Sequence, residues 1–84
     1  MKALVIFAEH RFFGESMPFG SDSFKNENLV YLTVEQTMMD YAEFIKYIKA
    51  NSTYNATEKP VIVFGGSYGG MLAAWLRMKY PHVF

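Results

Sequence analysis

The stretch VIVFGGSYGGMLAAWLRMKY, residues 61–80, decides the fold that the sequence predicts. It begins with four apolar residues, continues through a turn that holds four glycines around one serine, and ends in a run rich in helix formers. The turn matches the pattern Gly-x-Ser-x-Gly, in which a strand is followed by a sharp bend and a helix. We therefore expect a buried strand at 61–64, a tight turn centred on Ser67, and a helix after it.

The glycines around Ser67 predict that its backbone is strained and that its hydroxyl is lifted above a sheet. Side chains larger than hydrogen at the flanking positions would collide with the neighbouring strand and helix. The N-terminus of the following helix and the backbone N–H of Tyr68 would face the negative oxygen that forms when Ser67 attacks a carbonyl. The sequence thus predicts a nucleophilic serine with Tyr68 as an oxyanion-hole donor, and the elbow glycines are Gly65, Gly66, Gly69 and Gly70.

A glycine-rich turn that only allows close packing, or that binds a phosphate, is the alternative interpretation of the same residues. A phosphate-binding loop ends in Gly-Lys-Ser or Gly-Lys-Thr, and a dinucleotide-binding turn requires glycine where Ser67 stands. Both patterns fail here, which favours the nucleophile turn.

The upstream sequence predicts the rest of a βαβ unit, and hence an α/β fold. Residues 3–8, ALVIFA, form an unbroken apolar run of strand length, and 12–28 have the breakers of a long loop or of short turns. Residues 33–36, TVEQ, fit a capping box that starts a helix. Apolar side chains then recur at helical spacing: Val34, Met38, Tyr41, Ala42, Ile45 and Ile48. Because both strands would be parallel, residues 9–11 and 65–70 would meet at one sheet edge.

A complete catalytic triad is not expected in this chain. No Asp or Glu follows Ser67, and His82 would lie about 20 Å away, at the far end of the helix that Ser67 opens. His10 precedes the serine and is flanked by opposite charges, so a structural ion-pair role is expected for it. Two strands and one helix also leave the sheet uncovered. We therefore interpret residues 1–84 as a partial, incomplete catalytic domain.

The amino-acid composition mainly excludes certain partners and certain kinds of site. Eight basic side chains balance eight acidic ones, so no strong field attracts nucleic acid or a membrane surface. The apolar runs are far shorter than the roughly 20 residues that cross a bilayer, and from the pattern of residues 1–20 we expect no signal peptide there. There is no cysteine, and the two histidines lack metal-ligand spacing. The sequence therefore predicts neither a bound metal ion nor a cofactor.

Three blocks of the sequence resemble the family of lysosomal Pro-X carboxypeptidases and dipeptidyl peptidases II. The blocks are FAEHRFFGESMPFG, LTVEQTMMDYAEFIKYIK and GGSYGGMLAAWLRMKYPH, which together cover almost the whole chain. The resemblance implies an α/β-hydrolase fold and a serine peptidase that cleaves peptides with a penultimate proline at a chain end. Ser67 matches the family nucleophile, and Met71 matches a position that lines the pocket for the proline ring, although a methionine there also suits helix packing.

The same resemblance implies further features of a parent protein. The EHR block of this chain, residues 9–11, matches a family block whose role we interpret mainly as anchoring a loop. The family's acid, base and second oxyanion donor lie outside residues 1–84. The parent would be lysosomal or secreted, and a homodimer is one option for it. Two acceptor patterns for N-glycosylation, at Asn51 and Asn55, lie in the polar loop 50–60 on the side opposite Ser67 and fit such a route, although a plain turn is the simpler interpretation.

Three functions remain open at this point. The first is a segment of a prolyl serine carboxypeptidase, with dipeptidyl peptidase II-like cleavage as its variant. The second is a serine esterase or lipase of the same fold, because the elbow serves esters and amides alike. The third is a truncated product without activity of its own, since loss of the triad histidine costs about a million-fold in turnover.

Overall fold

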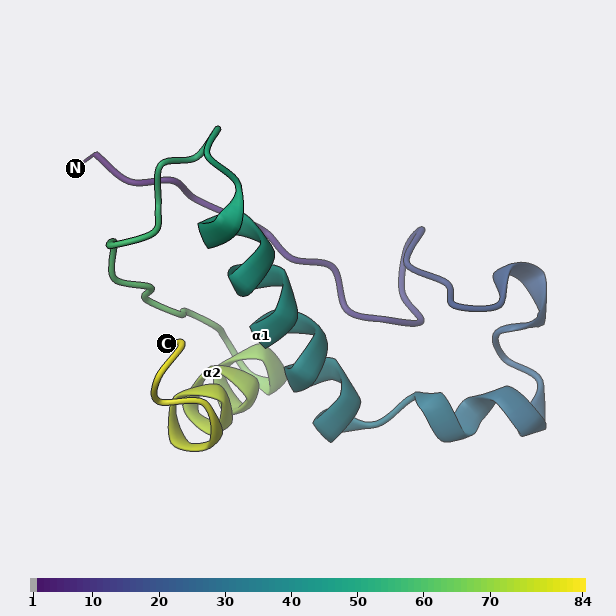
Figure 1. Cartoon of the computed structure of the whole chain (residues 1–84). Coiled ribbons are helices and arrows are strands. Elements are labelled where there is room, and N and C mark those ends of the chain that lie inside the picture. Colours follow the sequence, from purple (N-terminus) through teal and green to yellow (C-terminus); the bar gives the residue numbers. More distant parts are fainter. Residues whose placement is uncertain (1) are drawn as a thin grey trace. The chain divides into compact units, whose positions relative to one another are not determined.

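The computed structural model describes residues 2–84, and within that range it is helical (Figure 1). The elements are the 3-10 helices η1 (Gly20–Asp22) and η2 (Asn26–Tyr31), and the α-helices α1 (Val34–Ala50) and α2 (Tyr68–Lys79). The chain divides into two compact units, Met1–Thr37 and Met38–Phe84. Among the described residues, no helix combines the length and the apolar character that crossing a membrane requires.

The start of α1 confirms the predicted helix boundary. The Gln36 backbone N–H donates to the Thr33 hydroxyl at 3.2 Å, and the Thr37 hydroxyl donates to the Thr33 carbonyl at 2.8 Å. When the Gln36 amide is oriented to satisfy its neighbours, it donates to the Thr33 hydroxyl and to the Tyr31 carbonyl, each at 2.9 Å. The threonine half of the capping box is therefore present, while the glutamine amide satisfies the turn that precedes the helix.

The buried apolar side chains of the second unit come from α1 and α2. On α1 they follow the predicted face, with Met38, Ala42 and Ile48 each at most 6% exposed. On α2 they are Leu72 and Leu76, four residues apart and therefore on one side of the helix. The predicted helices are confirmed, and their apolar sides form the core of this unit.

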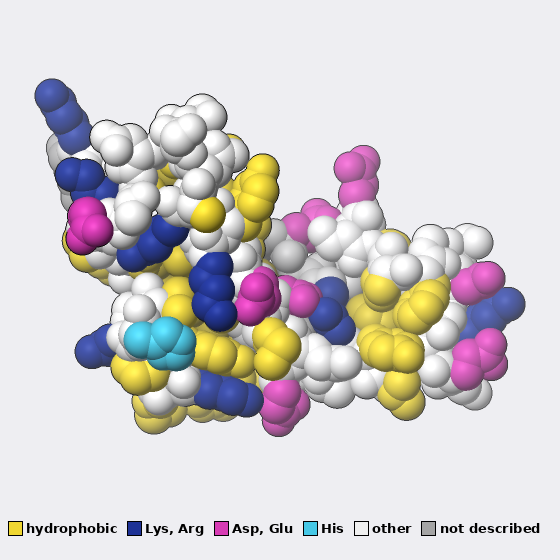
Figure 2. Space-filling model, viewed as in Figure 1, with side chains coloured by type: hydrophobic (Ala, Val, Ile, Leu, Met, Phe, Trp, Pro, Cys, Tyr) yellow, Lys and Arg dark blue, Asp and Glu magenta, His cyan; other side chains and the backbone are white. Residues whose placement is uncertain are grey.

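Neither predicted strand forms within residues 2–84, so the expected βαβ unit is not confirmed. Residues 3–8 are exposed, and 61–64 alternate between partly buried and exposed, with Phe7 96% and Phe64 87% exposed. Figure 2 shows hydrophobic side chains on the face that it draws. The physical reason is that a strand is stabilised by hydrogen bonds to at least one neighbouring strand and by a covered face. Local apolar character alone does not supply these partners.

The EHR block ties the first unit together through hydrogen bonds. Glu9 Oε1 accepts the Ser16 backbone N–H at 2.7 Å, and the Arg11 guanidinium donates to the Tyr31 carbonyl at 2.8 Å. The His10 Nε2 atom lies 3.3 Å from the Thr37 hydroxyl, in the first turn of α1. These contacts support the interpretation of loop anchoring, and the Thr37 hydroxyl is one of the groups that His10 contacts.

The turn that follows the EHR block has an unusual backbone. Phe12 has a left-handed φ of 71° and is only 1% exposed. Its backbone N–H donates to the Ser16 carbonyl at 2.8 Å. Gly14 also has a positive φ of 56°, and a Cβ there would overlap the Glu9 carboxylate. Glycine at position 14 therefore lets the Glu9 side chain fold back onto the turn.

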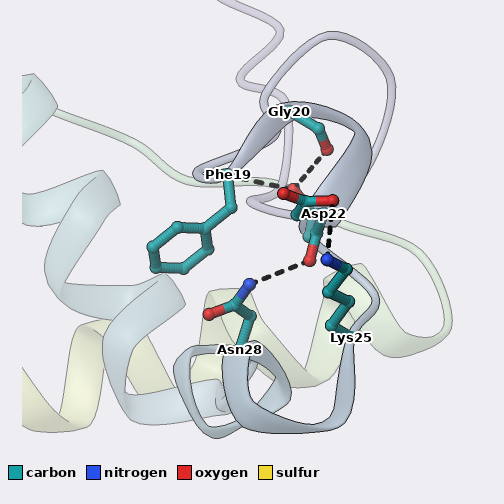
Figure 3. Close-up of polar contacts among 6 residues, drawn as sticks. Phe19, Gly20, Asp22, Lys25 and Asn28 are labelled. Atoms are coloured by element: carbon teal, nitrogen blue, oxygen red, sulfur yellow. Dashed lines mark hydrogen bonds and ion pairs between the residues drawn. The ribbon is translucent and has the colours of Figure 1, made fainter.

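Polar side chains order the segment around η1, which the sequence predicted as a loop or short turns (Figure 3). The Ser23 hydroxyl is buried, donates to the Gly20 carbonyl at 2.8 Å and accepts the Phe19 N–H at 3.2 Å. The Asn28 amide donates to the Asp22 carbonyl at 2.9 Å. Such bonds from side chains to the backbone satisfy groups that no regular element pairs here.

The hydrogen bonds at Glu9 predict a shifted titration. The Ser16 hydroxyl, and then the Ser16 backbone N–H, hold the pKa of Glu9 below its ordinary value of 4.5, because both stabilise the charged carboxylate. We expect Ser16→Ala to raise this pKa toward the ordinary value and Ser16→Thr to keep it low. Since the folded pKa is depressed, the contribution to stability is present above the unfolded pKa and is lost as pH falls through the folded pKa. Carboxyl-carbon NMR titration measures the shift, and an unchanged Glu9 pKa in Ser16→Ala would contradict the assignment.

Candidate active site

Ser67 stands at the N-terminal boundary of α2 with a backbone that few non-glycine residues adopt. Its φ is 53° and its ψ is −124°, and its side chain is exposed. The Ser67 carbonyl accepts the Met71 N–H at 3.0 Å, so the helix begins directly after the strained residue. Such a conformation costs on the order of 1–3 kcal/mol, and it persists only where the surrounding structure holds it.

Two glycines hold the chain in this bend by letting backbone segments touch. A Cβ on Gly65 would overlap the Gly69 carbonyl and lie 2.7 Å from the Gly70 nitrogen. A Cβ on Gly70 would lie 3.0 Å from the Gly65 oxygen. The residue that enters the turn therefore contacts the first turn of α2, and this close approach fixes the direction of the chain at Ser67.

The surroundings of the other two elbow glycines, Gly66 and Gly69, differ from the prediction. A Cβ on Gly66 or on Gly69 would meet no heavy atom within 4 Å among the described residues. The expectation that every flanking side chain would collide is wrong for these two positions, because it assumed a neighbouring strand, and no strand forms within residues 2–84. Of the four elbow glycines, Gly65 and Gly70 are the two at which backbone segments lie in close contact.

The predicted oxyanion-hole donor, Tyr68, and the predicted pocket residue, Met71, lie in the first turn of α2, directly after Ser67. Tyr68 is the first residue of the helix, where the partial positive charge of the helix dipole favours a developing negative oxygen. Met71, three residues after Tyr68, is 48% exposed. The structure therefore brings Ser67, Tyr68 and Met71 together on one short segment.

Tyr41 of α1 interacts electrostatically with Tyr68 of this turn, and the sequence did not single it out. Partial burial raises the pKa of the Tyr41 hydroxyl, and electrostatic interactions with Tyr68 and Asp40 raise it further. In the sequence Tyr41 reads only as one position of an apolar helix face, so no local signal could have identified it.

The two histidines lie in different units of the chain and in different surroundings. His82 follows the C-terminal end of α2, and the 12 residues of that helix separate it from Ser67 by about 18 Å along the axis. Its ring pairs with Tyr80 at a centroid distance of 6.3 Å. His10 belongs to the first unit, where its ring packs edge-on against Phe13 at 5.0 Å. Residues 2–84 also hold no group of three or more side chains that could ligate a metal.

A strained serine that opens a helix, with two close glycines around it, shares these two features with the nucleophile turn of serine hydrolases, although the strand that precedes that turn does not form within residues 2–84. Comparison with protein families assigns the whole chain to one class of such enzymes. Residues 1–84 match the family described as serine carboxypeptidase S28, and the chain belongs to this serine peptidase family.

Known relatives agree with this assignment over the full length of the chain. It is 57% identical to human lysosomal Pro-X carboxypeptidase and 56% identical to the mouse protein of that name, over 84 residues in each case. It is also 46% identical to prolyl carboxy peptidase like protein 5 of Caenorhabditis elegans. These alignments cover 99% of this chain and 17% of each relative, so the chain spans about a sixth of their length.

The contrast between Gly65 and Gly66 gives a test of the turn. We expect Gly65→Ala to lower the free energy of unfolding by about 1–3 kcal/mol, because the new methyl group overlaps the Gly69 carbonyl. Gly66→Ala should have little effect, because its Cβ meets open space. Urea unfolding of both variants measures the difference. Equal destabilisation by the two substitutions would contradict the proposed contact.

Proposed function

We propose that this chain is the nucleophile-bearing segment of a serine carboxypeptidase that cleaves peptides after proline at a chain end. The observation that carries the proposal is the backbone of Ser67, which has a φ of 53° at the start of α2 in a chain of the S28 family. A strained residue with an exposed hydroxyl is expected where function requires that hydroxyl. The preference for proline rests on the relatives, two of which are named Pro-X carboxypeptidase.

The chemistry proposed for Ser67 is acyl transfer. Its hydroxyl oxygen attacks the carbonyl carbon of the Pro-X bond while a base accepts the hydroxyl proton. The oxyanion would be stabilised by the N-terminus of α2, with the Tyr68 backbone N–H as one donor. The C–N bond then breaks, the leaving amine takes the proton, and water hydrolyses the acyl-enzyme. Met71 would line the pocket for the proline ring.

The acid and base of this mechanism are proposed to lie in a longer protein that contains this segment. Supporting this, no Asp or Glu follows Ser67 and His82 lies beyond the opposite end of α2. The same longer protein would supply sheet neighbours for residues 3–8 and 61–64, giving an α/β-hydrolase fold. The exposure of Phe7 and Phe64 supports that part of the proposal, because such side chains are normally covered. The names of the relatives support a lysosomal location.

A fluorophosphonate probe, which reacts with activated serines, tests the role of Ser67. We expect no labelling of residues 1–84 alone, and labelling at Ser67 in the longer protein that carries them. In that protein Ser67→Ala should abolish labelling and lower turnover by about a million-fold, while Ser52→Ala, in the loop after α1, should leave both unchanged. Labelling of the longer protein at another serine would reject Ser67 as the nucleophile.

Substrate choice distinguishes the reactions that this fold can catalyse. We expect the longer protein to release the last residue from a peptide that is blocked at its N-terminus and ends in Pro-Phe. Release of an N-terminal X-Pro dipeptide instead would assign dipeptidyl peptidase activity. Turnover of simple esters without either peptide would assign an esterase.

A further inference from the structure

The polar loop after α1 carries two N-glycosylation patterns that the peptidase proposal does not use. They are Asn51-Ser52-Thr53 and Asn55-Ala56-Thr57, only four residues apart. Both belong to the second unit, and their surroundings in the structure differ. This difference in surroundings indicates which of the two asparagines is the better N-glycan acceptor.

Asn51 is held at the end of α1. Its backbone N–H donates to the Tyr47 carbonyl at 3.1 Å, which continues the hydrogen bonding of the helix. Its side-chain oxygen accepts the Thr53 N–H at 3.0 Å and so closes a turn, and the residue is half-buried. The Asn51 side chain therefore serves a local structural purpose.

Asn55 lies in a more open position. It is exposed and has a left-handed φ of 49°, a conformation that asparagine tolerates better than most residues. Its backbone N–H donates to the Ser52 carbonyl at 3.3 Å. The hydroxyl of its pattern partner, Thr57, donates to the Lys49 carbonyl at 3.0 Å and so anchors the loop to the end of α1. The fold thus holds the backbone of this pattern while the Asn55 side chain stays accessible.

From these contacts we propose that Asn55 is the preferred N-glycan acceptor of this chain, with Asn51 less occupied. In the transfer, a bond forms between the Asn55 Nδ2 atom and C1 of an oligosaccharide. The bond between C1 and a lipid pyrophosphate breaks, the pyrophosphate leaves with the electron pair, and Nδ2 loses one proton. The proposal requires passage through a compartment that holds such a lipid-linked donor, and it is independent of any chemistry at Ser67.

The position of the loop makes a glycan compatible with the proposed peptidase. The loop follows the C-terminal end of α1, while Ser67 opens α2, and Figure 1 draws the loop apart from both α2 and its start. Both segments belong to the second unit. A glycan on Asn55 would extend from the exposed loop and leave the Ser67 turn uncovered.

Site-resolved glycan mapping tests the preference. The protein that carries this segment would be produced in eukaryotic secretory cells and treated with an amidase that removes N-glycans and converts the carrier Asn to Asp. Tandem mass spectrometry then gives the occupancy of Asn51 and Asn55 separately. We expect most of the glycan on Asn55, its loss in Asn55→Gln and Thr57→Ala, and its retention in Asn51→Gln.

Thr57→Ser is the matched control, because serine keeps both the acceptor pattern and a hydroxyl that can bond to Lys49. It should retain the glycan, which separates loss of the pattern from general disturbance of the loop. Equal occupancy of the two asparagines, a glycan on Asn51 alone, or no glycan on either residue would overturn the proposal.

Discussion

The contact between the two backbone segments at Gly65 and Gly70 is the constraint on which the rest of this site depends. Because neither residue has a Cβ, the chain can enter the turn against the first turn of α2 and reverse direction within a few residues. Ser67 lies between them and adopts a left-handed backbone as a result. The position of its hydroxyl, the start of α2 and the neighbourhood of Tyr68 all follow from this approach.

The features that sequence predicted well are those decided by neighbouring residues. The threonine cap at position 33 and the three-and-four spacing of apolar residues located α1, and the glycines around Ser67 located the turn and the helix after it. In each case the determining groups lie within about one helical turn of one another. Local chemistry was therefore sufficient, and the family resemblance drawn from the same residues is confirmed.

The features that sequence predicted poorly depend on partners that are distant in the chain. Residues 3–8 and 61–64 have the composition of buried strands, yet composition cannot supply the neighbouring strands that a sheet requires. The same limit applies to the raised pKa of Tyr41, because one of its causes is Tyr68, 27 positions further along the chain. It applies also to Gly66 and Gly69, because their predicted collisions depended on a strand that does not form within the described residues.

Replacing Ser67 by glycine and by alanine gives the most direct measure of backbone strain at the turn. Alanine keeps a Cβ and therefore the strain of the left-handed backbone, whereas glycine adopts that backbone freely. In urea unfolding of the protein that carries this segment, Ser67→Gly should be about 1 kcal/mol more stable than Ser67→Ala. At an unstrained position the order reverses, because glycine increases the entropy of the unfolded chain. A more stable alanine variant would show that Ser67 is not held in the strained turn, and would contradict its assignment as the nucleophile.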